Sequence, residues 1–222
     1  MRTQVASPGS AQELLAHARR FSGLRIAEVA DSMGMATPSD QRRAKGFVGQ
    51  LLERALGSTA GSADVPDFPD LGIELKSLPI GANGAPREST FVCTVPLSEI
   101  TEVEWLASRV RRKLARVLWI PVEANPEVNL GQRRIGTPIL WTMDRSAEQD
   151  LKADWDLLAG LLATGRIEEV TAHLGTFLQV RPKAAHSGVR TRAPEADGAF
   201  LLHNPRGFYL RTQFTKRVLT QL

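Results

Sequence analysis

The sequence predicts a mixed α/β protein, and three observations predict it. Apolar side chains at helical spacing fill the N-terminal part of the 222-residue chain, short β-rich runs follow residue 66, and a long amphipathic helix returns near residue 146. With 42% apolar and 23% charged residues the chain can bury one substantial core. Because helices and strands do not alternate regularly, we expect one α/β domain over residues 1–222, and the same pattern allows a division into two lobes.

The N-terminal part is predicted to be helical after a loose arm over residues 1–9. Ser10 is a capping residue before the first apolar stripe. Thr37 and Pro38 combine a capping hydroxyl with proline at the first helical position, and Gly57 ends the helix that they open. The predicted helices cover residues 12–21, 25–33 and 38–56.

Later segments are predicted as strands, turns and one more helix. The β-rich runs cover residues 72–78, 90–95, 117–122, 139–142, 177–180 and 208–211. Residues 80–88 contain two glycines and a proline, which predicts a hairpin turn between the first two strands. Residues 146–162 predict a helix with one apolar stripe and its acids on the opposite, solvated side. A Gly/Ser-rich loop is expected at residues 57–66 and a mobile loop at about residues 184–204.

Composition excludes several classes of protein. Cys93 is the single cysteine, so the chain has neither an internal disulfide nor a zinc site built from several thiolates. No window approaches the ~18 consecutive apolar residues of a membrane span, and the N-terminus lacks the apolar stretch of a secretory signal. We therefore expect a soluble, cytoplasmic protein with no membrane partner. Motifs for nucleotide hydrolysis, dinucleotide binding and an α/β-hydrolase nucleophile do not occur.

Basic residues are unevenly distributed, although the net charge is only +4. One cluster lies between Arg109 and Arg116, and a second extends over residues 181–217, where acids are few. A basic run taken alone is most simply a solvated surface. Two such runs in a small protein favour a polyanionic partner such as DNA.

Asp67, Glu74 and Lys76 are the candidate catalytic residues. Residues two apart in a strand share a face, so Glu74 and Lys76 should project together. Asp67 precedes a bend that contains glycine. If the chain folds back at this bend, the Asp67 carboxylate lies close to Glu74. With the Leu75 carbonyl, the two carboxylates would form an all-oxygen site suited to Mg²⁺, as one or two ions.

Such a site serves phosphodiester hydrolysis, in which the metal ion lowers the pKa of a water and neutralises developing charge. Lys76 would position the attacking water. Glu53, on the third predicted helix, could supply a further carboxylate. In the alternative interpretation, Glu53 is an exposed helical acid paired with a base. An aspartate followed by Glu-X-Lys is common by chance, so the pattern alone does not identify a nuclease.

The residues around this pattern closely resemble the MutH family of DNA mismatch repair endonucleases. The resemblance extends from about Leu14 to Phe214. It is carried by Gly46–Glu53, Gly57–Ser62, Gly72–Pro79, Thr90–Cys93, Arg116–Val122, Gln132–Gly136, Gln179–Ala185 and Arg206–Leu210.

The resemblance implies a restriction-endonuclease-like fold, in which a mixed β-sheet flanked by helices forms two lobes around a DNA cleft. It implies a Mg²⁺-dependent nick 5′ to the G of unmethylated GATC, on the new strand of hemimethylated double-stranded DNA. It also implies activation by MutL, an indirect partnership with MutS, and a monomer.

The resemblance also assigns roles to individual residues. Asp67 and Glu74 match the metal ligands, Lys76 the catalytic lysine and Glu53 an accessory acid. Lys113 matches a further basic residue implicated in activity. The residues matched to DNA binding, including the positions associated with GATC and its methylation, are Lys45, Phe91, Arg181, Pro182, Lys183 and Tyr209.

Elementary chemistry leaves alternatives open for the DNA-binding residues. Tyr209, the only tyrosine, could accept a hydrogen bond from adenine N6 in the major groove, or it could be a half-buried strand aromatic. Arg181 and Lys183 could donate to guanine, or they could bind phosphate without reading sequence.

Two rival functions remain at this point. One is a catalytically silent adaptor that binds GATC, which the presence of Asp67, Glu74 and Lys76 disfavours. The other is a restriction enzyme of the same fold that cuts both strands, which the short chain disfavours because restriction relatives often carry a second, dimerising region.

Overall fold

The computed structural model describes residues 5–39, 46–61, 63–183 and 188–220. The chain divides into two compact units. Unit 1 comprises Met1–Arg87, Ala115–Thr142 and Leu219–Leu222, and unit 2 comprises Glu88–Leu114 and Met143–Val218. Each unit therefore combines segments that are distant in sequence.

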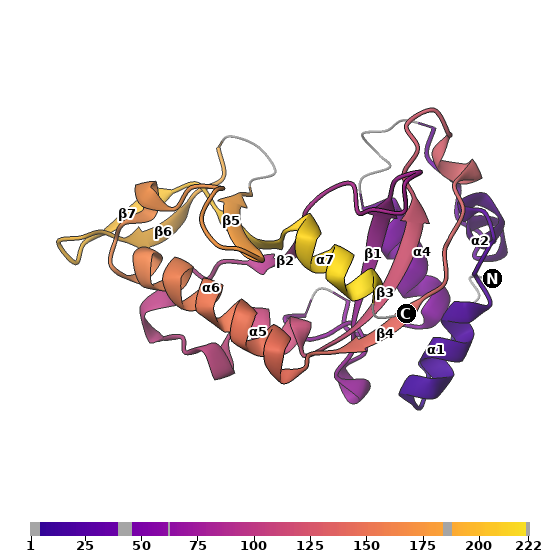
Figure 1. Ribbon diagram of the computed structural model, residues 1–222, viewed down its shortest axis with the longest axis horizontal. Coiled ribbons are helices and arrows are strands. Elements are labelled where there is room, and N and C mark those ends of the chain that lie inside the picture. Colours follow the sequence, from indigo (N-terminus) through magenta and orange to yellow (C-terminus); the bar gives the residue numbers. More distant parts are fainter. Residues whose placement is uncertain (1–4, 40–45, 62, 184–187, 221–222) are drawn as a thin grey trace. The chain divides into compact units, whose positions relative to one another are not determined.

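Unit 1 is built on a three-stranded mixed sheet with the order β1-β3-β4. Strand β1 (Glu74–Ile80) is parallel to β3 (Arg116–Glu123), and β3 is antiparallel to β4 (Ile139–Thr142). The helices of this unit are α1 (Ala11–Arg19), α2 (Ile26–Ser32) and α4 (Phe47–Leu56). Helix α4 contacts β1, and both α1 and α2 contact α4 (Figure 1). The predicted mixed sheet flanked by helices is confirmed.

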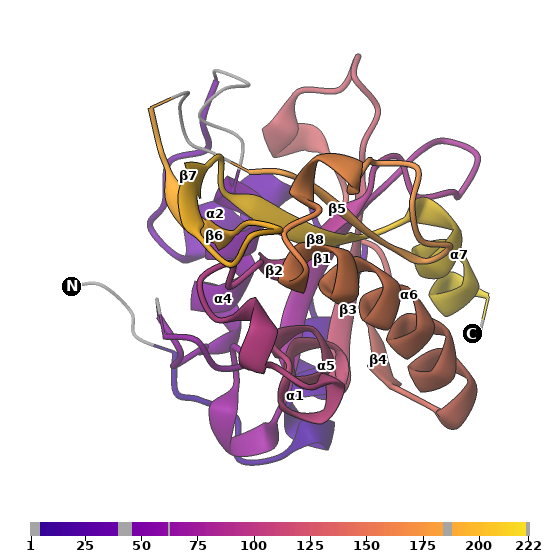
Figure 2. The same ribbon diagram turned by 90° about the vertical axis from the view of Figure 1, so that its left-hand side faces the viewer.

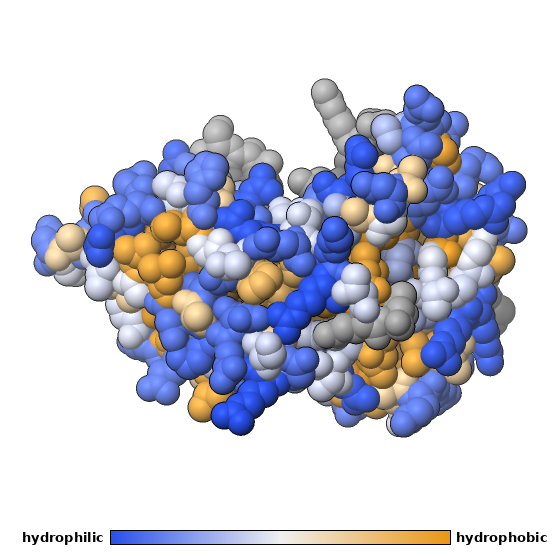
Figure 3. Space-filling view, viewed as in Figure 1, coloured by the Kyte–Doolittle hydropathy of each residue, from blue (hydrophilic) through white to orange (hydrophobic). Residues whose placement is uncertain are grey.

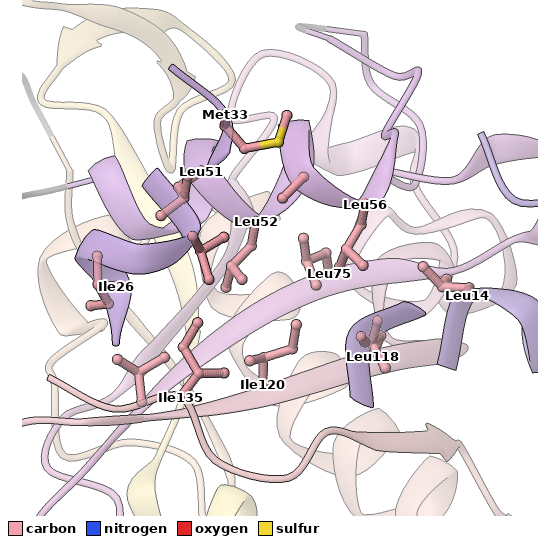
Figure 4. Close-up of a cluster of buried hydrophobic side chains, with 14 of the residues drawn as sticks. Leu14, Ile26, Met33, Leu51, Leu52, Leu56, Leu75, Leu118, Ile120 and Ile135 are labelled. Carbon is pink, nitrogen blue, oxygen red and sulfur yellow. The ribbon is translucent and has the colours of Figure 1, made fainter. Parts of the chain in front are cut away.

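The core of unit 1 lies between these helices and one face of the sheet (Figure 4). Leu51 and Leu52 of α4 are completely buried against the strands. Leu75 of β1 and Leu118 of β3 belong to the same cluster and are opposite one another in the parallel register. Because side chains alternate along a strand, Glu74 and Lys76 point away from this core.

The helix predicted from Thr37 and Pro38 is wrong at its N-terminus. Residues 35–38 form neither helix nor strand, and α4 begins at Phe47. Gly46 immediately before it has a φ of 86°. This left-handed backbone cannot continue a right-handed helix, so the capping signal at Thr37 does not open α4. Residues 40–45 lie outside the described residues.

The hairpin predicted between residues 72–78 and 90–95 is also wrong. The chain does reverse there, because the Gly81 N–H donates to the Ala85 carbonyl and Ile80 bridges to Pro86. The two strands nevertheless enter different sheets. Turn residues specify a reversal of the chain, whereas the pairing partner depends on tertiary contacts that local signals do not encode.

Unit 2 is built on an antiparallel sheet with the order β2-β8-β5 and on a separate hairpin (Figure 2). Its strands are β2 (Thr90–Thr94), β5 (Leu178–Pro182), β6 (Thr191–Pro194), β7 (Phe200–His203) and β8 (Arg206–Leu210). Its helices are α5 (Arg109–Leu114), α6 (Arg145–Ala163) and α7 (Thr212–Leu219). Leu178, Val180, Phe208 and Leu210 form the buried side of this sheet.

Short 3₁₀ helices connect the main elements. They are η1 (Pro69–Leu71), η2 (Ile100–Glu102), η3 (Trp105–Ala107), η4 (Leu130–Gln132) and η5 (Ile167–Glu169). Among the described residues, no helix is both long enough and apolar enough to span a membrane. Hydrophilic side chains cover most of the face seen in Figure 3.

The prediction that all acids of the helix at residues 146–162 face solvent is wrong for Asp154. This residue is only 7% exposed, and its carboxylate accepts hydrogen bonds of 2.6–2.8 Å from the N–H groups of residues 176–178. Arg211 donates to the carbonyls of Ala172, Leu174 and Gly175 in the same segment. Asp154 and Arg211 therefore fasten the segment that leads into β5, which fixes where β5 begins.

The two segments expected to be loose are only partly described. Val5 packs against the unit 1 core, and residues 5–9 carry neither helix nor strand. Within the predicted loop at 184–204, the structure has the hairpin β6–β7, while residues 184–187 lie outside the described residues. The mobility of this segment stays a prediction.

Candidate active site and nucleic-acid interface

A tight reversal of the chain brings Asp67 back to β1. Phe68 and Ile73 pair in antiparallel fashion, with the Phe68 N–H donating to the Ile73 carbonyl at 2.9 Å. Between them, η1 ends at Gly72, whose φ of 62° suits glycine. As a result, Asp67 Oδ2 accepts a hydrogen bond of 2.7 Å from the backbone N–H of Leu75.

Strand geometry places the Leu75 carbonyl on the same edge as Asp67. The N–H and C=O groups of one strand residue point to the same side of the strand. The Leu75 N–H points to Asp67, and no strand among the described residues pairs with that edge of β1. The carboxylate of Asp67 and the carbonyl of Leu75 are therefore neighbouring oxygen donors on an open sheet edge.

Glu74 and Lys76 project together from the other face of β1, as predicted. Lys76 Nζ lies 2.7 Å from Glu74 Oε1, and the two side chains are 12% and 5% exposed. Lys76 is also opposite Trp119, a fully buried residue of β3. Side chains in such a packed position have few alternative rotamers, so the ammonium group is held in place.

The donor set around Leu75 suits a hard cation. The candidate ligands are the carboxylates of Asp67 and Glu74 and the carbonyl of Leu75, and oxygen ligands of this kind bind Mg²⁺. Within the described ranges no three side chains of His, Cys, Asp or Glu form a group that could hold a metal ion. The candidate site therefore depends on the carbonyl of Leu75 and on further ligands such as water or phosphate.

Helix α4 is fastened to Asp67 at its C-terminus. The Glu53 carbonyl accepts from the Ser58 N–H at 2.9 Å, and the Ser58 hydroxyl donates to the Asp67 carbonyl at 2.8 Å. Glu53 is half-buried on the last turns of α4. Lys45, the other predicted residue of this region, lies outside the described residues.

Four predicted residues gather with Gly207 on the sheet of unit 2, and we call this group the aromatic face: Phe91, Arg181, Lys183, Gly207 and Tyr209. Phe91 and Tyr209 meet edge to face with their ring centroids 5.3 Å apart. The Arg181 guanidinium carbon lies 5.5 Å from the Tyr209 centroid, and Lys183 Nζ lies 2.8 Å from that of Phe91. Arg181 also donates to the Ser89 hydroxyl.

Strand register explains why these residues meet. Tyr209 of the central strand β8 is opposite Phe91 of β2, and Gly207 is opposite Arg181 of β5. A Cβ atom at Gly207 would lie 3.0 Å from Phe91, 3.1 Å from Tyr209 and 3.3 Å from Lys183. The absence of a side chain at Gly207 therefore allows the aromatic rings and Lys183 to converge.

Burial raises the pKa of Tyr209, and the charge of Arg181 partly offsets this effect. The hydroxyl is therefore protonated at neutral pH and can both donate and accept a hydrogen bond.

The two remaining predicted residues are Lys113 and Pro182. Lys113 is half-buried on α5 in unit 2, whereas Asp67, Glu74, Lys76 and Glu53 belong to unit 1. Pro182 is exposed at the end of β5.

Gly207 and Gln179 of the unit 2 sheet were not singled out by sequence reasoning. Gln179 is two residues from Arg181 on β5, and Gly207 is two residues from Tyr209 on β8. Each therefore shares a strand face with a residue that was predicted to bind DNA, and this spacing could have identified them.

Comparison with known proteins identifies the family. A family model described as DNA mismatch repair enzyme MutH matches residues 56–154. The DNA mismatch repair protein MutH of Vibrio parahaemolyticus is 48% identical over 212 residues, which cover 96% of this chain and 94% of the relative.

Two further relatives carry the same name. The protein of Vibrio cholerae is 49% identical over 96% of both chains, and that of Shewanella baltica is 46% identical over 99% of this chain and 98% of its own. The mixed sheet flanked by helices agrees with the restriction-endonuclease-like fold of this family. The chain belongs to the MutH family of DNA mismatch repair enzymes.

Proposed function

We propose that the protein is a Mg²⁺-dependent endonuclease of methyl-directed mismatch repair. It hydrolyses the phosphodiester bond 5′ to the G of an unmethylated GATC and nicks the new strand of hemimethylated DNA. The observation that carries this proposal is the hydrogen bond from Leu75 to Asp67, next to the Glu74–Lys76 ion pair, on β1 of a MutH chain.

The metal ligands in this proposal are the carboxylates of Asp67 and Glu74 and the carbonyl of Leu75. A bound Mg²⁺ neutralises charge on the phosphate and lowers the pKa of a water. Asp67 Oδ2 accepts a hydrogen bond from the Leu75 N–H, and Glu74 Oε1 accepts one from Lys76 Nζ. An ionised carboxylate has two oxygens with about four lone-pair sites, so each side chain can accept these hydrogen bonds and also bind a cation.

Lys76 orients the attacking water and offsets negative charge in the transition state. Its ammonium group has three N–H donors, and Glu74 Oε1 accepts one of them at 2.7 Å. The other two can be directed to a water and to a phosphate oxygen. Glu53 would be an accessory acid, while Lys45 and Lys113 would contact the DNA near the scissile bond.

The aromatic face would recognise the target sequence. Arg181 and Lys183 can donate to guanine O6 and N7, and Tyr209 can bond to the amino group of adenine. A methyl group on adenine N6 removes one proton and adds bulk in the major groove. The contact with Tyr209 would therefore weaken on a methylated strand.

The repair role places the protein in a sequence of events with other components. We propose that it acts as a monomer in the cytoplasm, that MutL activates it, and that MutS acts on it indirectly. A DNA nick of this kind has to follow mismatch detection, because cutting every unmethylated GATC would break newly made DNA indiscriminately.

A plasmid nicking assay tests the proposal. Supercoiled plasmid with GATC sites is incubated with Mg²⁺ in unmethylated, hemimethylated and fully methylated forms. We expect open circles from the first two forms and almost none from the third, and Glu74→Gln should abolish nicking. Glu127→Gln, an exposed acid of the same unit, is the matched control and should nick normally.

Other outcomes would point to a different function. Equal nicking of all three methylation states would contradict methylation sensing. Prompt linear product would indicate a restriction enzyme that cuts both strands. Binding of GATC with no nicking under any condition would indicate a silent adaptor.

A further inference from the structure

Gln179 occupies an unusual position on the sheet of unit 2. It lies on β5 directly opposite Tyr209 of β8, and it is only 6% exposed. Its side-chain amide makes no hydrogen bond with any residue that the structure describes. A side-chain amide in this confined position without a protein partner has hydrogen-bonding capacity left for a ligand.

Strand alternation places Gln179 on the aromatic face. Its neighbours Leu178 and Val180 are buried on the opposite side of the sheet, together with Phe208. Gln179 therefore shares a side with Tyr209, and residues directly opposite in an antiparallel pair have Cβ atoms about 5 Å apart. Arg181, two residues further along β5, lies on the same side.

Tyr209 has an unused polar group as well. Its hydroxyl makes no hydrogen bond within the described part of the chain. The fully enclosed side-chain nitrogen and oxygen atoms without a partner there belong to Thr90, Arg116, Trp119 and Arg206. The amide of Gln179 and the hydroxyl of Tyr209 are not among them, so both retain contact with solvent and are available to a ligand.

We infer that the Gln179 amide is a further base-reading group, which recognises adenine beside Tyr209. This inference rests on the proposed function, because it requires that the aromatic face binds the bases of the target site. Glutamine fits the major-groove edge of adenine in a bidentate manner. Its Oε1 accepts a hydrogen bond from the N6 proton that faces the major groove, which it shares with the Tyr209 hydroxyl oxygen in a three-centre bond, and its Nε2 donates to adenine N7.

The same contact makes Gln179 sensitive to methylation. One N6 proton of adenine is used in the Watson–Crick pair, and the other faces the major groove. A methyl group that leaves the base pair intact replaces the second proton. That proton forms the hydrogen bond that Gln179 Oε1 would accept, so methylation removes one of the two hydrogen bonds and places a methyl group against the amide.

A base-analogue experiment tests the inference. The GATC duplex is compared with a duplex in which the target adenine is 7-deaza-adenine, where a C–H replaces the N7 acceptor. Nicking rates in Mg²⁺ are measured for the wild type, for Gln179→Met and for Gln149→Met, in which an exposed glutamine of α6 is replaced in the same way. Methionine keeps the length of the side chain and removes both polar atoms.

The wild type and Gln149→Met should nick the analogue about tenfold more slowly than adenine, which is the discrimination expected of one good base contact. Gln179→Met should nick both duplexes at the same reduced rate. The ratio of the two rates comes from one enzyme preparation, so it does not depend on how much of the variant is folded.

Equal sensitivity to the analogue in the wild type and Gln179→Met would overturn the inference, because another group would then read N7. A wild type that nicks the 7-deaza-adenine duplex as fast as the unmodified duplex would also overturn the inference. The proposed function would survive that result. A wild type that does not nick the unmodified duplex would overturn the proposed function itself.

Discussion

The carboxylate of Asp67 accepts a hydrogen bond of 2.7 Å from the backbone N–H of Leu75. The two residues are eight positions apart in the sequence, and the reversal between Phe68 and Ile73 brings them together. The bond holds one carboxylate beside the strand edge to which the Leu75 carbonyl also points. One interaction thus fixes two of the oxygen donors in the proposed metal site.

Asp67→Asn should separate the structural role of Asp67 from its role in catalysis. The amide oxygen can still accept from Leu75, so the free energy of unfolding should change by less than about 1 kcal/mol in urea titrations. Nicking should fall by at least about a hundredfold, because a neutral ligand binds Mg²⁺ poorly.

Asp70→Asn provides the control for this substitution. Asp70 is exposed in η1, within the same reversal, and its replacement should leave both stability and nicking unchanged. If Asp70→Asn lost as much activity as Asp67→Asn, the effect would belong to the loop and not to a metal ligand.

Lys76→Met should destabilise unit 1 as well as inactivate the enzyme. Removal of one partner leaves the carboxylate of Glu74, which is 5% exposed, without its 2.7 Å ion pair. Breaking a buried pair in this way costs about 3 kcal/mol, measured as a loss in the free energy of unfolding. Lys152→Met removes an ion pair between two half-exposed side chains of α6 and should cost less than about 0.5 kcal/mol. Equal losses for the two variants would show that Glu74 does not depend on Lys76.

Asp154→Ala should weaken unit 2 by roughly 3 kcal/mol, because three backbone N–H groups lose a charged acceptor. The start of β5 would lose its anchor, so binding to a GATC duplex should weaken too. Asp156→Ala, at an exposed position of the same helix, should alter neither quantity. Urea unfolding and fluorescence anisotropy measure the two effects, and a stable Asp154→Ala protein would contradict the anchoring role.

Tyr209 should titrate above its ordinary pKa, because burial disfavours the phenolate. It is the only tyrosine, so tyrosinate absorbance in the ultraviolet reports this residue alone. Arg181→Met should raise the pKa further, because the positive charge that favours the phenolate is removed.

The stability effect of Tyr209 follows from the same shift. A raised pKa in the folded state means that stability is fully present below the unfolded pKa, near 10, and is lost as pH rises through the folded value. A Tyr209 pKa below that of the urea-unfolded chain would contradict the burial seen here.

Local sequence patterns predict part of the geometry of the candidate site. The Glu74–Lys76 contact follows from the two-residue period of a strand, and the return of Asp67 follows from the glycine-containing bend. Both features depend on residues within ten positions of one another. The position of Lys113 relative to them depends on the packing of distant segments, which such patterns do not encode.

Longer-range pairing explains the errors. The turn at residues 80–88 is present, but β2 pairs with β8 from the other end of the chain. Asp154 looks like one more acid on an acidic helix, yet it caps the backbone that leads into β5. Strand β8 is distant in sequence from β2, and the start of β5 is distant from Asp154. Local propensity and residue spacing therefore could not indicate either contact.

A crystal structure with a GATC duplex and Ca²⁺, which replaces Mg²⁺ without supporting cleavage, would locate the cation, the scissile phosphate and Lys76 together. We expect a cation bound by the carboxylates of Asp67 and Glu74, the carbonyl of Leu75 and the phosphate 5′ to the G, with Lys76 Nζ beside that phosphate. A cation held by other residues, or a phosphate that approaches the protein away from β1, would show that the metal site does not lie on this strand.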